Sequence, residues 1–355
     1  MTLGVVMLVH THFERAEQVI RHWVAGGCPV VVHEDRNVND AEFDEFVKAL
    51  ADLDDIRFSA RHRCEWGMWG LVAATQNASQ MLLDEFAQVD RVFLASGACL
   101  PLRPISELRA FLDESPQTDF IESATTADVP WTVGGLDRER FTLRFPFAWK
   151  KRRTLFDAYV RIQQVFRVKR RIPKGIVPHM GSQWWCLTRK TLDAILHDPK
   201  RSRYDRYFRQ VWIPDESYFQ TLARKHATRI QSRSLTLSKF DFQGKPHIFY
   251  DDHAEILARS GCFFARKIWP HADALYDRFP CAKGPAKITP STGTVDRIFG
   301  KAVERRLRGR PGLYMQSRFP NMAKANGIAA VPYSVMQGFD ALFPGFEDWL
   351  SEQTD

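Results

Sequence analysis

The residues best suited to proton transfer form an acidic pair, Asp215-Glu216, which directly follows Pro214. A carboxylate can remove the proton of an attacking hydroxyl, and such a general base typically contributes about 10²–10⁴-fold in rate. An acidic pair is also common in the first turn of a helix, where it stabilises the unpaired backbone N–H groups. The pattern therefore leaves two interpretations open, a helix start or a catalytic base at Glu216.

A second segment, Phe263-Phe264-Ala265-Arg266-Lys267, places two cations directly after two aromatic residues and an alanine. Fixed Arg and Lys side chains can stabilise the charge that grows on a diphosphate leaving group. The same order of residues also suits the end of an amphipathic helix, whose dipole favours cations. The segment by itself does not decide between these interpretations.

Three further segments have residues typical of a ligand site. His33-Glu34-Asp35 ends the second predicted strand, and a carboxylate there could bind a uracil or ribose or belong to a solvated turn. Arg63–Gly70 contains two glycines at a predicted helix start, where backbone N–H groups favour anions. Arg63 is therefore a candidate residue for binding the phosphates of a donor substrate. Trp184 and Trp185 could form a stacking wall for a sugar or fill the core.

The elements that must position these residues alternate between strand and helix patterns in the first part of the chain. The expected strands are Val5–Val9, Val30–His33, Ile56–Ser59, Arg91–Ala95, Phe120–Ser123 and Ser182–Leu187. The expected helices are Glu14–Val24, Asp40–Leu53, Gly70–Phe86, Pro104–Glu114, Arg189–Leu196 and a helix from Pro214 to Lys225. Residues 125–179 have a weaker pattern, which predicts loops and one helix. This order predicts an α/β fold with a mostly parallel sheet flanked by helices.

The composition is that of a globular protein with a positive charge. Hydrophobic residues make up 45% and charged residues 26% of the 355 residues. The formal net charge of +8 favours anionic partners such as phosphate groups, nucleic acid or an acidic membrane surface. No nucleic-acid reading module is recognisable, so we expect no nucleic-acid partner. The basic runs at 150–153, 167–171 and 305–310 instead favour peripheral contact with an anionic membrane surface.

The cysteines and the N-terminal residues bear on the compartment. The six cysteines are scattered without a CxxC pair, so neither a zinc site nor a disulfide framework is expected. The apolar run Leu3–Val9 is too short for a membrane span and has no basic segment before it. We therefore expect a cytoplasmic protein that contacts the inner face of the membrane peripherally.

The end of the fourth predicted strand, Ser96–Leu102, contains no Asp-x-Asp pair. Many nucleotide-sugar enzymes use that pair at this place to hold a divalent cation between the donor phosphates. If donor phosphates bind here, their charge must be met by Arg and Lys. We therefore expect no metal and no cofactor apart from the donor itself.

Taken in order, these segments resemble the family of core-2/I-branching β-1,6-N-acetylglucosaminyltransferases and peptide O-xylosyltransferases over residues 3–270. The most specific parts are Gly181–Arg189, Pro214-Asp215-Glu216 and Phe264-Ala265-Arg266-Lys267, and Arg170–Ile176 is closest to the xylosyltransferase branch. The resemblance implies a GT-A-like (Rossmann-like) catalytic domain, assigned to residues 1–270. Residues 271–355 would form a C-terminal helical or irregular extension of unknown role.

The resemblance implies an inverting, metal-independent glycosyltransferase. It would move GlcNAc or xylose from a UDP-sugar to a hydroxyl of a glycan, peptide or polysaccharide. By this resemblance Glu216 matches the catalytic base, and Lys267 matches the lysine that contacts the donor diphosphate, where Arg266 would assist it. His33 and Asp35 match a His-x-Asp motif on the nucleotide side of the donor.

The acceptor side and the departures from the family complete these expectations. Glu122 lies near the sequence position of an acceptor-binding glutamate of the family. Trp184 and Trp185 would form one side of the sugar-binding site. Cys99 stands where the family has Asp in a Ser-Gly-x-Asp turn. In the strand where a second diphosphate-binding arginine is expected, this chain has Leu235, Thr236, Leu237, Ser238, Lys239 and Phe240, so Lys239 or Arg233 would substitute. These departures motivate a second hypothesis, a catalytically inactive nucleotide-sugar or carbohydrate-binding protein on the same fold.

Overall fold

The computed structural model describes residues 1–126, 138–238, 246 and 248–280, and it divides into two compact units. The first unit comprises, among the described residues, 1–97, 115–126 and 138–232. The second comprises 98–114 and the described residues from 233 onward. Lys239 and residues 281–355, which make up most of the expected C-terminal extension, lie outside the described residues. The proposed boundary at residue 270 stays a prediction.

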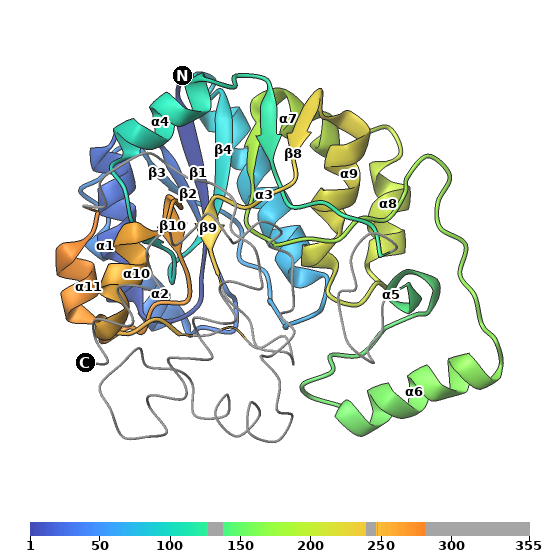
Figure 1. Ribbon diagram of the computed structural model, residues 1–355. Coiled ribbons are helices and arrows are strands. Elements are labelled where there is room, and N and C mark those ends of the chain that lie inside the picture. Colours follow the sequence, from blue (N-terminus) through green and yellow to red (C-terminus); the bar gives the residue numbers. More distant parts are fainter. Residues whose placement is uncertain (127–137, 239–245, 247, 281–355) are drawn as a thin grey trace, which may run out of the picture. The chain divides into compact units, whose positions relative to one another are not determined.

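A seven-stranded sheet forms the centre of the first unit, with the strand order β3-β2-β1-β4-β7-β6-β8 (Figure 1). Its strands are β1 (Leu3–Val9), β2 (Val30–Glu34), β3 (Ile56–Phe58), β4 (Arg91–Ser96), β6 (Thr118–Phe120), β7 (Cys186–Thr188) and β8 (Arg229–Gln231). Strand β7 runs antiparallel to its neighbours β4 and β6, and the other neighbouring pairs are parallel. The expected α/β fold with a mostly parallel sheet is confirmed.

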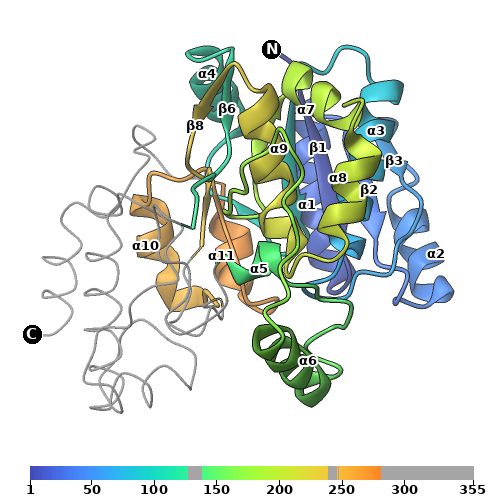
Figure 2. The same cartoon turned by 90° about the vertical axis from the view of Figure 1, so that its right-hand side faces the viewer.

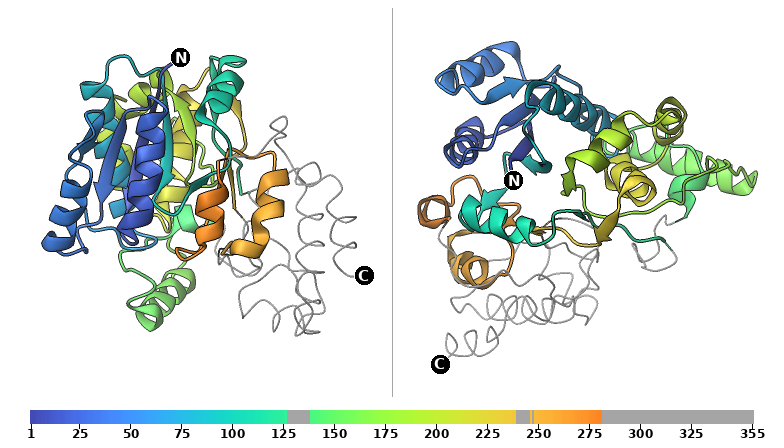
Figure 3. Two further views of the ribbon diagram at one scale, coloured as in Figure 1. Left: turned by 90° about the vertical axis from the view of Figure 1, so that its left-hand side faces the viewer. Right: turned by 90° about the horizontal axis from the view of Figure 1, so that it is seen from above.

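Helices cover both faces of this sheet. The helices of the first unit are α1 (Phe13–Ala25), α2 (Asp40–Ala49), α3 (Gly70–Glu85), α5 (Glu139–Thr142), α6 (Arg153–Val165), α7 (Arg189–Leu196), α8 (Arg201–Phe208) and α9 (Tyr218–His226), with a 3₁₀ turn, η1 (Pro214–Glu216). The chain moves from β1 outward to β3 and then returns to β4. Because parallel crossovers are right-handed, this reversal places α1 and α3 on opposite faces (Figure 3). Helices α7 and α9 pack together, with α8 beside them (Figure 2).

The strand interiors explain why the sheet forms. All seven residues of β1 and all six of β4 are buried, as expected for parallel strands covered on both faces. Gly4 lets helix α3 approach β1, because a Cβ there would lie 2.9 Å from a methyl carbon of Leu82. Trp23 of α1 packs against Phe93 of β4, with ring centroids 5.6 Å apart. The aromatic content is therefore used at least partly for core filling.

The reversal of strand order also defines the ligand edge of the sheet. In open α/β sheets, ligands bind outside the carboxyl ends of the strands where the order reverses. His33-Glu34-Asp35 occupies this edge at the end of β2, and Glu122 follows the end of β6. The antiparallel β7 begins at the same edge, because Phe120 of β6 pairs with Cys186 of β7. Residues before β7, including Ser182, therefore approach the same edge from the opposite direction.

The second unit contains a three-stranded sheet of order β5-β10-β9. Its elements are β5 (Leu100–Pro101), α4 (Ile105–Asp113), β9 (Thr236–Leu237), η2 (Asp251–His253), α10 (Ala254–Arg259), β10 (Phe264–Ala265) and α11 (Asp273–Arg278). Strand β10 pairs antiparallel with β5 and parallel with β9. The cations Arg266 and Lys267 thus follow a strand, and the helix-end interpretation of this segment is wrong.

Several element predictions need correction. The strand expected at Ser182–Leu187 begins only at Cys186, because the Ser182 N–H donates to a carboxylate oxygen of Glu122 instead of a neighbouring strand. The region 125–179 contains two helices in its described part, α5 and α6, where one was expected. Helix α8 and the short strands β5, β8 and β10 were not predicted. Strands of two or three residues carry too little periodicity to be recognised.

Two further observations concern cysteines and membrane spans. Cys28, Cys64, Cys99, Cys186 and Cys262 are free cysteines. Within the described part of the chain, no helix has the length and hydropathy needed to cross a bilayer.

The buried side chains of β4 should dominate the stability of the first unit. Phe93 is 1% exposed and Phe166, beyond the end of α6, is 75% exposed. We expect Phe93→Ala to lower the free energy of unfolding by about 3–5 kcal/mol, through lost burial and a cavity. The matched control Phe166→Ala should change it by less than about 0.5 kcal/mol. Chemical denaturation measures both values, and equal losses for the two variants would contradict the assigned core.

Candidate functional site

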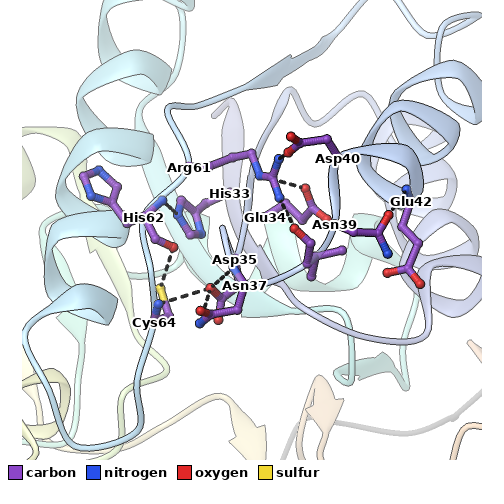
Figure 4. A network of polar contacts seen from close by, with 11 residues as sticks. His33, Glu34, Asp35, Asn37, Asn39, Asp40, Glu42, Arg61, His62 and Cys64 are labelled. Carbon is purple, nitrogen blue, oxygen red and sulfur yellow. Dashed lines mark hydrogen bonds and ion pairs between the residues drawn. The ribbon is translucent and has the colours of Figure 1, made fainter.

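The end of β2 holds Asp35 in one orientation. Its Oδ1 atom accepts hydrogen bonds from the backbone N–H of Asn37 at 2.9 Å and of Cys64 at 3.2 Å, and from the Asn37 side chain at 2.9 Å (Figure 4). The Asp35 N–H donates to the carbonyl oxygen of Val9 at 3.0 Å, which extends the β1–β2 ladder. The carboxylate is therefore fixed between its own turn and the loop that contains Cys64.

His33 is fixed by the same loop. It is 1% exposed, and its Nε2 atom accepts a hydrogen bond from the backbone N–H of His62 at 2.8 Å. Burial, together with the charge of His62, lowers the pKa of His33 to about 4. The ring is thus neutral at pH 7, and its proton lies on Nδ1 because Nε2 is an acceptor.

Arg61 ties the loop to β2 and was not found from the sequence. Its guanidinium lies 2.6 Å from Asp40 and 3.2 Å from the buried carboxylate of Glu34 (Figure 4). It also stacks over the Phe43 ring, 4.6 Å from the ring centroid. Burial raises the pKa of Glu34 to about 7, which the positive charge of Arg61 opposes. No pattern in the sequence linked Arg61 to Glu34, because the contact joins two segments through the fold alone.

The glycines in Arg63–Gly70 allow close backbone contacts, as expected. A Cβ on Gly70 would lie 2.0 Å from the carbonyl oxygen of Arg63. Gly67 has a φ of +77° and accepts a hydrogen bond from the Ile213 N–H at 3.2 Å. The loop therefore connects the end of β2 with the segment that leads into η1. The Arg63 side chain is exposed, and its role in donor binding stays a prediction.

Glu216 ends η1, just before α9. Its side chain is 23% exposed, and its Oε2 atom lies 3.6 Å from Nη1 of Arg140. Arg140 is 2% exposed and stacks over the ring of Trp212 at 4.9 Å. The Glu216 carbonyl oxygen accepts a hydrogen bond from the Gly181 N–H at 2.9 Å. The acidic pair therefore opens a helical segment and also presents a partly exposed carboxylate beside a buried cation.

Two other carboxyl groups lie around Glu216. Asp215 is buried, and desolvation followed by the charge of Glu216 raises its pKa to about 7. Glu122 is 2% exposed, and its Oε2 atom accepts a hydrogen bond from the Ser182 N–H at 2.8 Å. Burial raises the pKa of Glu122 well above its ordinary value, and the charge of Glu216 acts in the same direction. The structure thus brings together Glu122 and Glu216, both selected from the sequence.

The Cys64 thiol connects the residues at the end of β2 with the acidic residues of η1. Burial raises the pKa of its thiol to about 12, and the charges of Asp35 and Asp215 both contribute to this shift. A single thiol near both carboxylates shows that the end of β2 and η1 lie at one place in the first unit. Gly181 completes this region, since a Cβ there would lie 1.9 Å from the carbonyl oxygen of Glu122.

The two tryptophans before β7 lie in the core. Trp184 is 5% and Trp185 is 1% exposed, and the Trp185 ring packs on Phe219 with centroids 5.2 Å apart. Their burial favours the core-filling interpretation and leaves little ring surface for a sugar. Trp66 is 39% exposed and lies 6.3 Å from Trp212 between ring centroids, so it offers more accessible aromatic surface near η1.

The remaining cations belong to the second unit. Arg266 follows β10, and its N–H donates to the carbonyl oxygen of Leu237 in β9 at 2.8 Å. Lys267 accepts a hydrogen bond from the Phe249 N–H through its carbonyl oxygen at 2.8 Å, and both side chains are partly exposed. Arg233 stacks over Phe111 at 5.6 Å, and burial lowers its pKa to about 10. Lys239, the alternative to Arg233, lies outside the described residues.

The described part of the chain contains no group of three or more His, Cys, Asp or Glu side chains arranged to hold a metal ion. Cys99 is buried, at 2% exposure, in the turn after β4, which is the position of the Asp-x-Asp pair in many nucleotide-sugar enzymes. The absence of a metal requirement stays a prediction.

Comparison with known families assigns most of the chain. The family model of the core-2/I-branching enzyme matches residues 10–258. The chain belongs to this family. Membership implies glycosyltransferase activity, with a nucleotide-sugar donor and a glycan acceptor in general. The family expected from the sequence motifs is therefore confirmed, whereas the choice between GlcNAc and xylose stays a prediction.

The C-terminal part of this glycosyltransferase matches a second model. It is described as a family of unknown function (DUF5927) and covers residues 266–355. A search of curated proteins found no match to the chain.

The raised pKa of Asp215 makes stability depend on pH. Between the ordinary pKa of 3.8 and about 7 the unfolded chain loses this proton while the folded chain retains it, so stability falls as pH rises. We expect Asp215→Asn to gain stability relative to the parent between pH 4 and pH 8 by at least about 1 kcal/mol, since one pKa unit corresponds to about 1.4 kcal/mol. Urea denaturation at pH 4 and pH 8 measures the difference in the free energy of unfolding between the variant and the parent. The same difference at both would contradict a buried, proton-retaining Asp215.

Proposed function

We propose that this glycosyltransferase is an inverting, metal-independent enzyme that transfers GlcNAc or xylose from a UDP-sugar, with Glu216 as general base. The observation that carries the proposal is the position of Glu216 beside Arg140. Of the acidic side chains Glu122, Asp215 and Glu216, the first two are 2% and 8% exposed. Glu216 is 23% exposed, so an acceptor hydroxyl can reach its carboxylate.

The surroundings concentrate negative charge on Glu216. The raised pKa values of Glu122 and Asp215 favour their protonated forms, and the charge of Glu216 is a cause of both shifts. Arg140 stabilises an ionised Glu216 from 3.6 Å. Carboxyl groups whose environments separate their pKa values are typical of sites that divide acid and base roles.

The proposed reaction is a single in-line displacement. Glu216 accepts the proton of the acceptor hydroxyl as the hydroxyl oxygen attacks the anomeric carbon. The bond between that carbon and the diphosphate oxygen breaks on the opposite face, and UDP leaves with the electron pair. One displacement inverts the anomeric configuration.

Protein cations would stabilise the leaving group. We assign Lys267 and Arg266 to the diphosphate, with Arg233 or Lys239 as a further cation. Fixed positive side chains stabilise growing charge without reorganisation, which makes a metal ion dispensable. The neutral His33 and the fixed Asp35 would bind the uracil or ribose, and Arg63 the donor phosphates. The Ser96–Cys99 turn, which has no acidic residue, supports this division.

Glu216→Gln tests the base directly. The amide retains size and hydrogen-bonding capacity but cannot take a proton, so turnover should fall by at least about 100-fold while UDP binding is kept. The matched control is Glu85→Gln, which removes an exposed carboxylate paired with Arg57 at 3.3 Å and should leave turnover unchanged. UDP release and calorimetric UDP binding measure the two quantities. Near-normal turnover in Glu216→Gln would remove this residue from the mechanism.

Lys267→Ala tests how the diphosphate is held. Loss of one cation should weaken UDP binding about 10-fold or more, since a charged hydrogen bond contributes roughly 1.5–3 kcal/mol. Lys48→Ala, on the exposed surface of α2, is the control and should bind UDP normally. The parent should also keep its activity in excess EDTA. Activity that requires added Mg²⁺ or Mn²⁺ would refute the metal-independent assignment.

A panel of UDP-sugars distinguishes this proposal from an inactive binding protein. The enzyme should release UDP from UDP-GlcNAc or UDP-xylose, at least by slow hydrolysis. Binding of a UDP-sugar without any UDP release, with or without metal, would instead support the inactive hypothesis that Cys99 motivates.

A further inference from the structure

The positive charge of the chain is concentrated around α6. Between residues 150 and 171 nine Lys or Arg residues accompany one acidic residue, Asp157, which gives +8, the same as the formal net charge of all 355 residues. The rest of the chain is therefore neutral in sum. Some of these cations have protein partners, such as Lys151 with Glu65 and Arg170 with the Tyr207 ring. Eight of the nine are exposed, namely Lys150, Lys151, Arg152, Arg153, Arg161, Arg167, Lys169 and Arg171.

Helix α6 also carries an exposed apolar stripe. Seven large hydrophobic residues are exposed in the described part of the chain, and four of them lie on α6 or directly after it. They are Leu155, Ile162, Val165 and Phe166, with exposed fractions of 43%, 53%, 69% and 75%. With Ala158 their spacing is i, i+3, i+7, i+10 and i+11, which places them on one side of the helix.

A different side of α6 attaches the helix to the first unit. Phe156, Val160 and Gln163 are the buried residues of α6. Phe156 packs against Phe145 and Trp212, with ring centroids 5.4 and 5.6 Å apart. The exposed stripe is therefore additional to the packing side of the helix.

We infer that α6 and the basic residues at its two ends dock the protein on an anionic lipid bilayer. An interfacial helix buries an apolar side at the headgroup boundary while Lys and Arg beside it contact anionic lipids. The stripe from Leu155 to Phe166 supplies the apolar side, and the runs 150–153 and 167–171 supply the cations. Trp66, which is 39% exposed beneath the Lys150 ammonium at 5.1 Å, adds an aromatic residue of the kind enriched at membrane interfaces.

The charge pattern favours a bilayer over a protein partner. Both ends of the apolar stripe are flanked by cations, and the segment has a single acidic residue. A lipid surface offers a uniform negative charge around an apolar interior, which matches this arrangement along the whole helix. Phe156 of α6 packs on Trp212, and the guanidinium of Arg140 stacks over the ring of the same tryptophan. These contacts would place the docking helix next to the Glu216 region. The inference does not depend on the catalytic assignment.

Vesicle co-sedimentation of the full chain tests the charge requirement. The protein should bind vesicles of phosphatidylcholine mixed with phosphatidylglycerol and not vesicles of phosphatidylcholine alone. Arg161→Gln combined with Lys169→Gln should weaken this binding at least about 10-fold, since each cation contributes several-fold near an anionic surface. Arg203→Gln combined with Arg206→Gln, which removes two exposed cations of α8, should bind as the parent does. No binding to anionic vesicles, or equal weakening by both pairs, would overturn the inference.

The apolar requirement is tested separately. Ile162→Ser combined with Phe166→Ser should also weaken vesicle binding at least about 10-fold, because two apolar side chains no longer enter the bilayer. Both residues are exposed, so circular dichroism should show an unchanged fold. Light scattering of the same variants in the absence of lipid covers the alternative occupant. A parent dimer that becomes a monomer on these substitutions, together with unchanged vesicle binding, would show that the stripe joins two copies and would refute lipid docking.

Discussion

A buried guanidinium beside a partly exposed carboxylate is the interaction on which the candidate site depends. Arg140 is nearly inaccessible, and it stacks on Trp212 while it lies 3.6 Å from Glu216. A buried cation without a counter-charge would be costly, so the pair stabilises the negative charge of Glu216. The neighbouring Asp215 and Glu122 respond in the opposite way, because burial and the charge of Glu216 raise their pKa values. One region thus separates an accessible carboxylate from two carboxyl groups that favour the protonated form.

The same region joins elements from distant parts of the chain. The loop 61–70 fixes Asp35 at the end of β2 and also contacts the segment before η1 through Gly67. Trp212 connects η1 to α6, whose exposed side we assign to a lipid surface. Packing of one tryptophan therefore links the candidate base with the candidate membrane contact, and both lie in the first unit.

The central strands β1 and β4 could be predicted from the sequence because they are long apolar runs. The patterns at Val5–Val9 and Arg91–Ala95 predict β1 and β4. The observed bounds of these strands differ from the predicted ones by at most two residues at either end. Helix α7 was predicted with its observed bounds, since Thr188 caps it and its periodicity is clear. The two-residue strands of the second unit have no such signal, and β10 was open to interpretation as a helix end.

The candidate site residues also differ in whether a local sequence pattern predicts them. Glu216, Glu122, His33 and Asp35 could be selected as candidates because their motifs are local in sequence and resemble those of the family. Arg140 and Arg61 were missed because their roles come from contacts between distant segments, and the tryptophans Trp184 and Trp185 lie deeper than their motif indicated.

The anomeric configuration of the first product most directly tests direct attack assisted by Glu216. Proton NMR of the reaction before any anomeric equilibration gives this configuration. The account predicts a β-linked product from an α-linked UDP-sugar, because one displacement inverts the reacting carbon. An α-linked product would contradict it, since retention requires a different sequence of steps in which a single general base does not suffice.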